Sequence, residues 1–322
     1  MRLRSVLAAG FIAVAALAAA PAGAENWPAR PVRIIVGFSP GGSADHFGRL
    51  IAQELSETLG QQFFIEYHPG SSGIIAAGLT ARAAPDGYTL MIGGSGPHIT
   101  SPVINPNIGY DPLTDFTHVA MIGADSFVLI GSESFGASDL AGVVRRGRAA
   151  KNPLTFSSPG PASLGDLMME EFKRHTGIEM VHVPAPNSGL LDVMGSHIDM
   201  SITGLLTAGA QIRAGKVLPI GVTSTERNPV YKDIPTFAEQ GFDDIHGDTW
   251  FWLTAPKALP PTITETLNRE VRRILKTERV RAYFEREAAI AMDADVAELN
   301  RFLAGEIAYW GGLAKSVGLT IQ

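Results

Sequence analysis

The chain has 322 residues, 45% hydrophobic and 18% charged, which is typical of a globular protein of about two domains and excludes a disordered or fibrous one. Its formal net charge is −6, from 26 Lys and Arg against 32 Asp and Glu with no long basic run, so a nucleic-acid partner is not expected. Cysteine is absent, which excludes disulfides, thiolate metal sites and cysteine nucleophiles.

The first 24 residues have the pattern of a secretory signal peptide. Arg2 and Arg4 form a basic region, an alanine-rich apolar stretch runs from Val6 to Ala20, and small residues precede a cleavage position at Ala24. An uncleaved membrane anchor is the alternative, but about 20 strongly apolar residues are needed to span a bilayer and this stretch is shorter. We therefore expect cleavage after Ala24 and a periplasmic mature protein that is not embedded in the membrane.

Strands alternate with helices in the first part of the mature chain. Short runs rich in β-branched and aromatic residues predict strands over 32–38, 63–67 and 89–92. Apolar residues at helical spacing predict helices over 45–59 and 74–84. This alternation is typical of βαβ units and predicts a mainly parallel sheet.

A second series of the same kind follows, and then the pattern changes. The series comprises predicted strands over 128–130, 154–157, 180–183, 200–203 and 218–223, and helices over 140–150, 164–176 and 208–214. An aromatic strand over 249–254 and helices over 263–275 and 296–313 complete the chain. We interpret this order as two α/β lobes, with crossings near 119–127 and 250–254. Domain 1 is expected to comprise 25–123 and 253–322, and domain 2 to comprise 124–252.

Gly- and Ser-rich loops that follow the predicted strands carry the main functional signal. They run from Ser39 to Asp45, from Gly93 to Gly96, and from Ser157 to Ser163. Loops at the carboxyl ends of parallel strands converge on one crevice, and helix N-termini carry unpaired amides that favour anions. Any one of these loops can be explained as a turn or a helix cap. Their recurrence in both lobes predicts a cleft for an anionic ligand.

Enzyme motifs are incomplete in this sequence. A nucleophile elbow centred on Ser95 would need Gly at position 97, where the chain has Pro97. Gly215-Lys216 lacks the first glycine of a phosphate-binding loop, and no dinucleotide-binding fingerprint is present. We therefore expect a binding protein without a cofactor rather than an enzyme.

Histidine and aspartate side chains give weaker signals. Asp244, His246 and Asp248 lie two residues apart and could meet a metal, but this spacing is common in solvated turns, so no metal site is expected. His46 and His98 adjoin the glycine-rich loops, and either could donate a hydrogen bond to a carboxylate. The alternative for both is a packing or surface role.

Short motifs in a fixed order along the chain point to a known family. They are Arg30-Pro31-Val32-Arg33-Ile34-Ile35-Val36, Pro40-Gly41-Gly42-Ser43-Ala44-Asp45, Ala84-Pro85-Asp86-Gly87-Tyr88-Thr89-Leu90, Tyr110-Asp111-Pro112-Leu113-Thr114-Asp115-Phe116, Val181-His182-Val183-Pro184, Ala214-Gly215-Lys216 and Ile234-Pro235-Thr236. In order and spacing they resemble the tripartite tricarboxylate transporter substrate-binding proteins, also called the Bug family. The resemblance implies a two-lobed type II periplasmic binding protein fold of class α/β. Each lobe would be a mainly parallel sheet flanked by helices, and two crossing strands would join the lobes.

The resemblance also implies ligands, partners and a site. Family members bind di- or tricarboxylates, acidic amino acids or aromatic carboxylates in the interlobe cleft, and they deliver them to the membrane permease subunits of a tripartite tricarboxylate transporter. A sensory role, in which the ligand is presented to a membrane-bound kinase, is the alternative. Carried onto this chain, the ligand-binding candidates are Phe38, Ser39, Gly41, Gly42, Ser43, Ser72, Ser95, His98, Ser158, Gly160, Ser163, Asn187 and Thr203.

Two departures from the family pattern bear on specificity. Where relatives carry a Tyr-Lys-Gly-Gly-like stretch, this chain has the shorter Ala185-Pro186-Asn187-Ser188-Gly189, which loses an aromatic ring and a cation. Relatives often have an Asp-Asn pair where this chain has Thr203-Gly204. Because Thr203 cannot neutralise a ligand ammonium, an amino acid is less favoured. We expect a roomier cleft and a dicarboxylate or an aromatic carboxylate as ligand.

Overall fold

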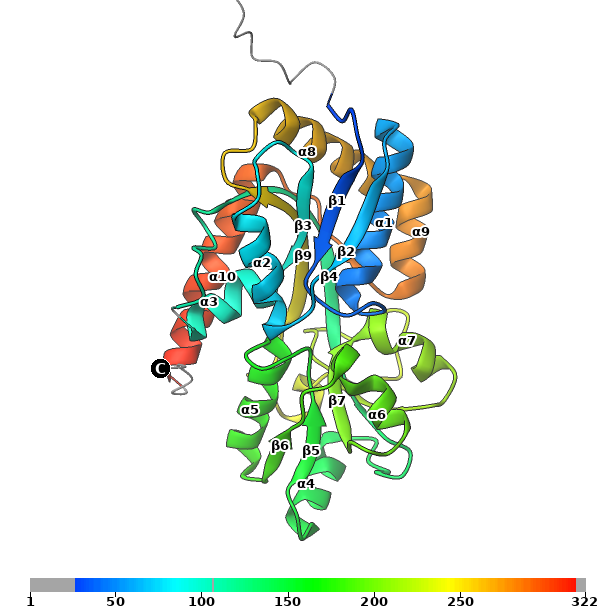
Figure 1. The fold of residues 1–322 in the computed structure, drawn as a ribbon. Helices are drawn as coiled ribbons and strands as arrows, with labels where there is room; N and C mark the ends of the chain where they lie inside the picture. Colours follow the sequence, from blue (N-terminus) through cyan, green and yellow to red (C-terminus); the bar gives the residue numbers. More distant parts are fainter. Residues whose placement is uncertain (1–26, 106, 317–322) are drawn as a thin grey trace, which may run out of the picture.

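The computed structural model describes residues 27–105 and 107–316. They fold into two α/β lobes, one above the other in Figure 1, with a pair of long strands passing between them. The predicted signal peptide and its cleavage position lie outside the described residues. The mixed α/β architecture with two lobes confirms the predicted fold class.

The first lobe is built on three parallel strands, β2 (Phe63–Tyr67), β1 (Val32–Val36) and β3 (Thr89–Gly94), in that order. These strands are apolar because helices cover both faces of the sheet. Ile34 and its neighbours on one face pack against α1 (Ser43–Leu59), whereas Ile35 on the other face packs against α2 (Ile74–Ala81). The carboxyl ends of all three strands point toward the second lobe, so the loops that follow them lie at the junction (Figure 1).

The second lobe repeats this plan with β6 (Met180–His182), β5 (Leu154–Ser157) and β7 (Met200–Gly204), which are also parallel. One face is covered by α5 (Leu164–Thr176), and the other by α6 (Leu190–Met194) and α7 (Leu205–Arg213). Strand β8 (Leu218–Val222) adds to this sheet, and helix α4 (Leu140–Ala149) is one of the helices that cover it. The matching plan places a second set of strand-to-helix loops opposite those of the first lobe.

Two antiparallel strands, β4 (Phe116–Gly131) and β9 (Asp248–Pro256), join the lobes. The sequence analysis predicted a strand over 128–130 and a crossing near 119–127. The structure joins the two in one continuous strand, which pairs with β9 up to Ser126 and with β7 and β8 from Phe127 onward. Strand β9 runs against β3 and β4 in the first lobe, and β4 runs against β7 and β8 in the second. The remaining major strands of each lobe share one direction, so each sheet is mainly parallel.

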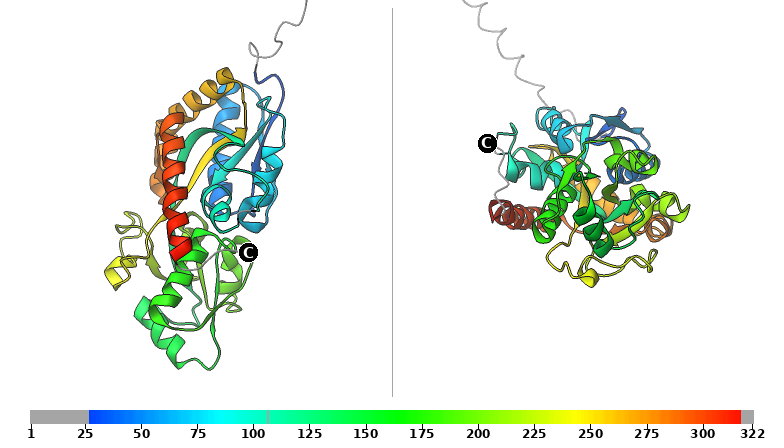
Figure 2. Two further views of the ribbon diagram at one scale, coloured as in Figure 1. Left: turned by 90° about the vertical axis from the view of Figure 1, so that its left-hand side faces the viewer. Right: turned by 90° about the horizontal axis from the view of Figure 1, so that it is seen from below.

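The C-terminal part of the chain returns to the first lobe. It comprises α8 (Pro261–Leu275), α9 (Glu278–Glu287), β10 (Ile290–Ala291) and α10 (Val296–Ser316). Figure 2 shows α10 running along the first lobe, where it contacts β4 and α3 (Ser101–Ile104), and its end reaches the second lobe. The sequence analysis missed α9 because its only buried side chains are Val280 and Phe284, too few for a visible apolar stripe.

Candidate ligand-binding site

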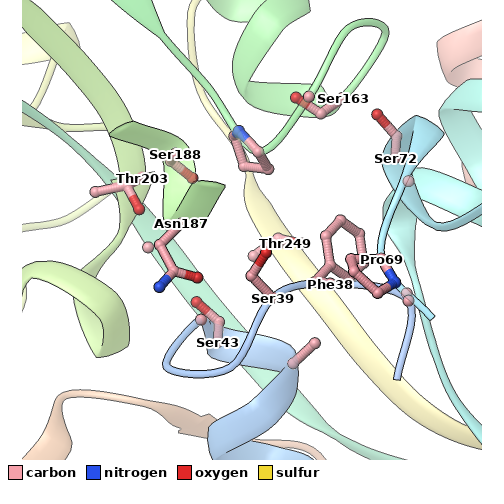
Figure 3. A pocket seen from close by; sticks show the side chains of 18 of the residues that line it. Phe38, Ser39, Ser43, Pro69, Ser72, Ser163, Asn187, Ser188, Thr203 and Thr249 are labelled. Atoms are coloured by element: carbon pink, nitrogen blue, oxygen red, sulfur yellow. The ribbon is translucent and has the colours of Figure 1, made fainter. Parts of the chain in front are cut away.

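A cavity of about 400 Å³ lies between the lobes, where the strand-to-helix loops of both lobes meet (Figure 3). Most of the predicted site residues line it: Phe38, Ser39, Gly42, Ser43, Ser72, Ser95, Gly160, Ser163, Asn187 and Thr203. No ionisable side chain stands among the described residues that line this cavity. Its polar groups are therefore hydroxyls, one amide and the backbone.

In the first lobe, the loop before α1 is braced by Asp45 in the first turn of that helix. The Asp45 carboxylate accepts hydrogen bonds from the Gly41 amide at 2.8 Å, the Tyr67 hydroxyl at 2.6 Å and the Arg49 guanidinium at 2.8 Å. Burial raises the pKa of Asp45, but these hydrogen bonds outweigh it and hold the pKa below its usual value. Gly41 thus gives its amide to Asp45 and is not part of the cavity wall. The amides of Ser43 and Ala44, the first two of α1, have no intrahelical acceptor, and both residues line the cavity.

The second lobe braces its corresponding loop in the same way. The Asp166 carboxylate in the first turn of α5 accepts a hydrogen bond from the Ala162 amide at 2.8 Å, and the Ser163 hydroxyl caps the helix by accepting from the Asp166 amide at 3.2 Å. Ser158 lies behind the wall, where its Oγ is 2.9 Å from Nε2 of His182. The N-termini of α1 and α5 therefore approach the cavity from opposite lobes, and both favour negative charge.

Left-handed turns in the two lobes form the remaining walls and touch the opposite lobe. Residues 71–73 and 187–189 all have positive φ angles, and a helix follows each turn directly. The Ser72 hydroxyl donates to the carbonyl oxygen of Pro161 at 2.6 Å, and Nδ2 of Asn187 donates to the carbonyl oxygen of Pro40 at 2.8 Å. Because each bond joins one lobe to the other, the lobes are closed over the cavity in this structure.

A buried carboxylate stands directly behind the wall. Asp125 on β4 is fully buried and accepts a hydrogen bond from the Ser43 hydroxyl at 2.5 Å and a weaker one from the Leu206 amide at 3.3 Å. Burial raises the pKa of Asp125 to about 7, although these hydrogen bonds oppose the rise. A Cβ at Gly204 would collide with Asp125 and Ser43, so the carboxylate fills the space left by that glycine.

Asp125 changes one expectation from the sequence. The absence of an acid near Thr203 was inferred from position 203 alone, yet the structure brings an acid to this place from a different strand. Register explains the placement, because Phe127 of β4 pairs with Gly204 of β7. No local motif around Asp125 marks it, so the sequence analysis missed it.

Neither histidine that the sequence analysis considered lines the cavity. His98 is fully buried, with its ring 4.7 Å from that of Phe116 and 5.3 Å from that of Trp252, and burial lowers its pKa well below the usual value. The π-helical turn over Gly96–Thr100 directs this side chain into the core of the first lobe. His46 lies in a surface hollow, where its Nδ1 is 3.0 Å from the Tyr283 hydroxyl.

Several lining residues were not among the candidates, notably Pro69, Phe127, Thr207, Thr249 and Phe251. The sequence contained a pattern from which Thr249 and Phe251 could have been predicted. They alternate with two tryptophans along the predicted crossing strand, and successive side chains of a strand point to opposite faces. The tryptophans face away from the cavity: Trp250 packs on Phe302 at 5.2 Å, and Nε1 of Trp252 donates to His118 at 3.1 Å.

The fold and the cavity define a two-lobed binding protein whose site lies between its lobes. Residues 47–319 match the family model described as the tripartite tricarboxylate transporter family receptor. The chain is 31% identical to protein BugT of Bordetella pertussis over 315 residues, which are 97% of this chain and 96% of BugT. The chain therefore belongs to the tripartite tricarboxylate transporter receptor family, whose members are periplasmic solute-binding proteins rather than enzymes.

Solved structures of similar proteins share this architecture. The R. palustris protein Rpa4515 with adipate has a TM-score of 0.87 and 33% identity, covering 91% of this chain and 98% of its own. MatC (Rpa3494) from Rhodopseudomonas palustris with bound malate has a TM-score of 0.82 and 29% identity, covering 89% of this chain and 99% of its own. Within residues 27–105 and 107–316, no helix is long and apolar enough to cross a membrane, and no group of acidic or histidine side chains could hold a metal ion.

Proposed function

We propose that this protein captures a small carboxylate in its interlobe cavity, with a dicarboxylate or an aromatic carboxylate favoured, and delivers it to the permease of a tripartite tricarboxylate transporter. The approach of two helix N-termini, those of α1 and α5, to one uncharged cavity carries this proposal. Two positive helix ends on opposite walls suit a ligand with a carboxylate at each end. The adipate and malate bound to the two similar proteins are both dicarboxylates of this kind.

Neutral hydrogen-bond donors are sufficient to bind a carboxylate in this cavity. Hydrogen bonds to a charged group contribute about 1.5–3 kcal/mol each, so a few amides and hydroxyls can reach the roughly −8 kcal/mol of a micromolar complex. Donors from both lobes reach one ligand only when the lobes are closed. Ligand binding therefore favours the closed state, which is the form that a permease would recognise.

A thermal-shift screen of the protein from residue 25 onward tests the binding step. The panel comprises aliphatic di- and tricarboxylates, aromatic carboxylates and acidic amino acids. A ligand at 100 times its dissociation constant adds about 2.7 kcal/mol to the free energy of unfolding, which gives a clear rise in melting temperature. A rise confined to one class of carboxylate supports the proposal and identifies that class, whereas no rise with any carboxylate contradicts it.

Delivery is tested in cells. We expect uptake of the identified carboxylate to require both this protein and the permease subunits. A transcriptional response to the carboxylate that persists without the permease would instead favour the sensory role. The same strains provide exported protein, and its intact mass tests the proposed removal of residues 1–24.

We also propose the domain division given by the sequence, with 25–123 and 253–322 in domain 1 and 124–252 in domain 2. Its support is the change of sheet partners along β4, which pairs with β9 up to Ser126 and with β7 and β8 beyond it, three residues after the proposed boundary. Comparison of ligand-free and ligand-bound crystal structures tests the division, because each domain should superpose as a rigid unit.

A further inference from the structure

One corner of the cavity presents hydrogen-bond acceptors rather than donors. We call it the acceptor corner and define it by Ser43, Thr203 and Asn187, with Asp125 behind it. These residues come from α1, β7 and the loop before α6, so the corner forms only when the lobes are closed (Figure 3). It differs from the rest of the site, where helix N-termini supply donors.

Asn187 contributes its side-chain oxygen. Its Nδ2 donates to the carbonyl oxygen of Pro40, and because a carbonyl only accepts, this contact fixes which way the amide is turned. Oδ1 therefore lies on the Ser43 side in Figure 3, buried and without a hydrogen-bond partner among the described residues. A buried amide oxygen without a partner is costly, which favours a donor from a ligand at this point.

Ser43 contributes an acceptor because of Asp125. A hydroxyl has one proton, and when Asp125 is ionised the Ser43 proton is directed at its carboxylate, 2.5 Å away. Thr207 Oγ1, at 3.3 Å, can use one of the two lone pairs of Ser43, which leaves the other for the cavity. Asp125 does not line the cavity itself. It is a positioning residue that decides whether Ser43 accepts or donates.

Thr203 completes the corner. Its side chain is 1% exposed and lines the cavity, and its Oγ1 has no hydrogen-bond partner within the described part of the chain. A threonine hydroxyl both accepts and donates, so it can exchange hydrogen bonds with another hydroxyl. The corner thus holds two groups ready to accept and one that can do either.

We propose that the acceptor corner binds a hydroxyl group of the ligand, so that the carboxylate carried by this protein is a 2-hydroxycarboxylate. This inference rests on the proposed function. A carboxylate is disfavoured in the corner because its oxygens only accept and because Asp125 stands behind Ser43. An ammonium is less favoured than a hydroxyl because Asp125 lies behind Ser43, and no carboxylate lines the cavity to pair with the ammonium directly. The hydroxyl lies next to a carboxylate of the same ligand because Ser43 also supplies the first amide of α1.

Calorimetric titration with matched ligands tests the inference. The pairs are malate and succinate, 2-hydroxyglutarate and glutarate, and mandelate and phenylacetate, with aspartate, glutamate and phenylglycine as the amino counterparts. We expect the hydroxy member of the pair that binds to do so about tenfold more tightly than its unsubstituted partner. Equal affinities within a pair, or tighter binding of the amino counterpart, would overturn this inference and leave the proposed function intact. If no carboxylate binds, the proposed function fails and this inference fails with it.

Substitutions test which residues cause the preference for the hydroxy ligand. Thr203→Val and Ser43→Ala should reduce the hydroxy preference to about threefold or less, whereas Thr249→Val, at another cavity-lining threonine, should keep it. Asp125→Asn should also remove the preference, because the new amide can donate to Ser43 and turn its hydroxyl into a donor. Melting temperatures identify any variant that fails to fold. A full preference in folded Thr203→Val and Asp125→Asn proteins would overturn the assignment.

The preference should also depend on pH. Protonation of Asp125 lets it donate to Ser43, so the ratio of affinities should be smaller at about pH 6 than at about pH 8.5. The titratable groups that act on Asp125 are Asp248 on β9, Tyr231 in the loop after β8 and Tyr283 on α9. The tyrosines remain neutral in this range, since burial raises the pKa of both. A ratio of affinities that is the same at both pH values in the wild type would contradict the role of Asp125.

Discussion

The Ser72 hydroxyl in the first lobe donates a hydrogen bond to the Pro161 carbonyl oxygen in the second lobe at 2.6 Å. Ser72 is 4% exposed, so this bond lies at a closed junction rather than on an open surface. A Cβ added at the neighbouring Gly160 would lie 2.8 Å from the same hydroxyl oxygen. Closure thus brings these two loops into direct contact at the edge of the cavity.

Ser72→Ala should weaken ligand binding by about threefold to tenfold, because it removes a hydrogen bond made only in the closed state. Calorimetry measures the affinity. Small-angle scattering should show that the ligand-free variant has a larger radius of gyration than the ligand-free wild type. Ser71→Ala is the control, since Ser71 also lines the cavity and has a similar positive φ of 47° but makes no interlobe hydrogen bond among the described contacts. Equal effects of the two substitutions would mean that the interlobe bond does not contribute.

Gly160→Ala should abolish binding and leave the fold intact. The new methyl group would press on Ser72 when the lobes close, and the φ of +151° at this position is strained for any residue with a side chain. Gly177→Ala is the control, because Gly177 also has a positive φ but nothing within 4 Å of a new Cβ. Both variants should lose about 1 kcal/mol of stability, and Gly160→Ala alone should lose the ligand. Retained affinity in Gly160→Ala would place the ligand elsewhere.

Asp125 should make stability depend on pH. Burial raises its pKa to about 7, above the value of 3.8 for an exposed Asp. The native state therefore holds this proton more tightly than the unfolded state, and the stability that it contributes is complete below about pH 4 and is lost as the pH rises through 7. The free energy of unfolding of wild type relative to Asp125→Asn should fall by a few kcal/mol over this range, at about 1.4 kcal/mol per pKa unit. Urea denaturation at several pH values measures it, and parallel curves would contradict the prediction.

His98→Leu should leave ligand affinity unchanged within about twofold. The His98 ring is fully buried in the first lobe, and both ring nitrogens lack hydrogen-bond partners among the described residues. Because leucine removes two buried nitrogen atoms that have no partner, the melting temperature should stay the same or rise. A large loss of affinity without a loss of stability would restore the role in binding that the sequence suggested.

The sequence by itself determined most of the elements and the loops that form the site. Residues 63–67, 154–157 and 164–176 have the predicted bounds, because apolar periodicity, helix caps and glycine stops are encoded within a few residues of where they act. The Gly- and Ser-rich loops were visible for the same reason. Their recurrence in both lobes predicted that they meet in one cleft, and the family motifs predicted the same.

Only the tertiary structure decided which side chains face the ligand. Ser43 and Asp125 are 82 positions apart, and their contact depends on where β4 lies relative to α1. His98 is two residues from cavity-lining Gly96, yet a π-helical turn and the packing around Trp252 carry it into the core. Strand register and helix packing fix such directions through contacts between distant segments, and no local pattern in the sequence contains that information.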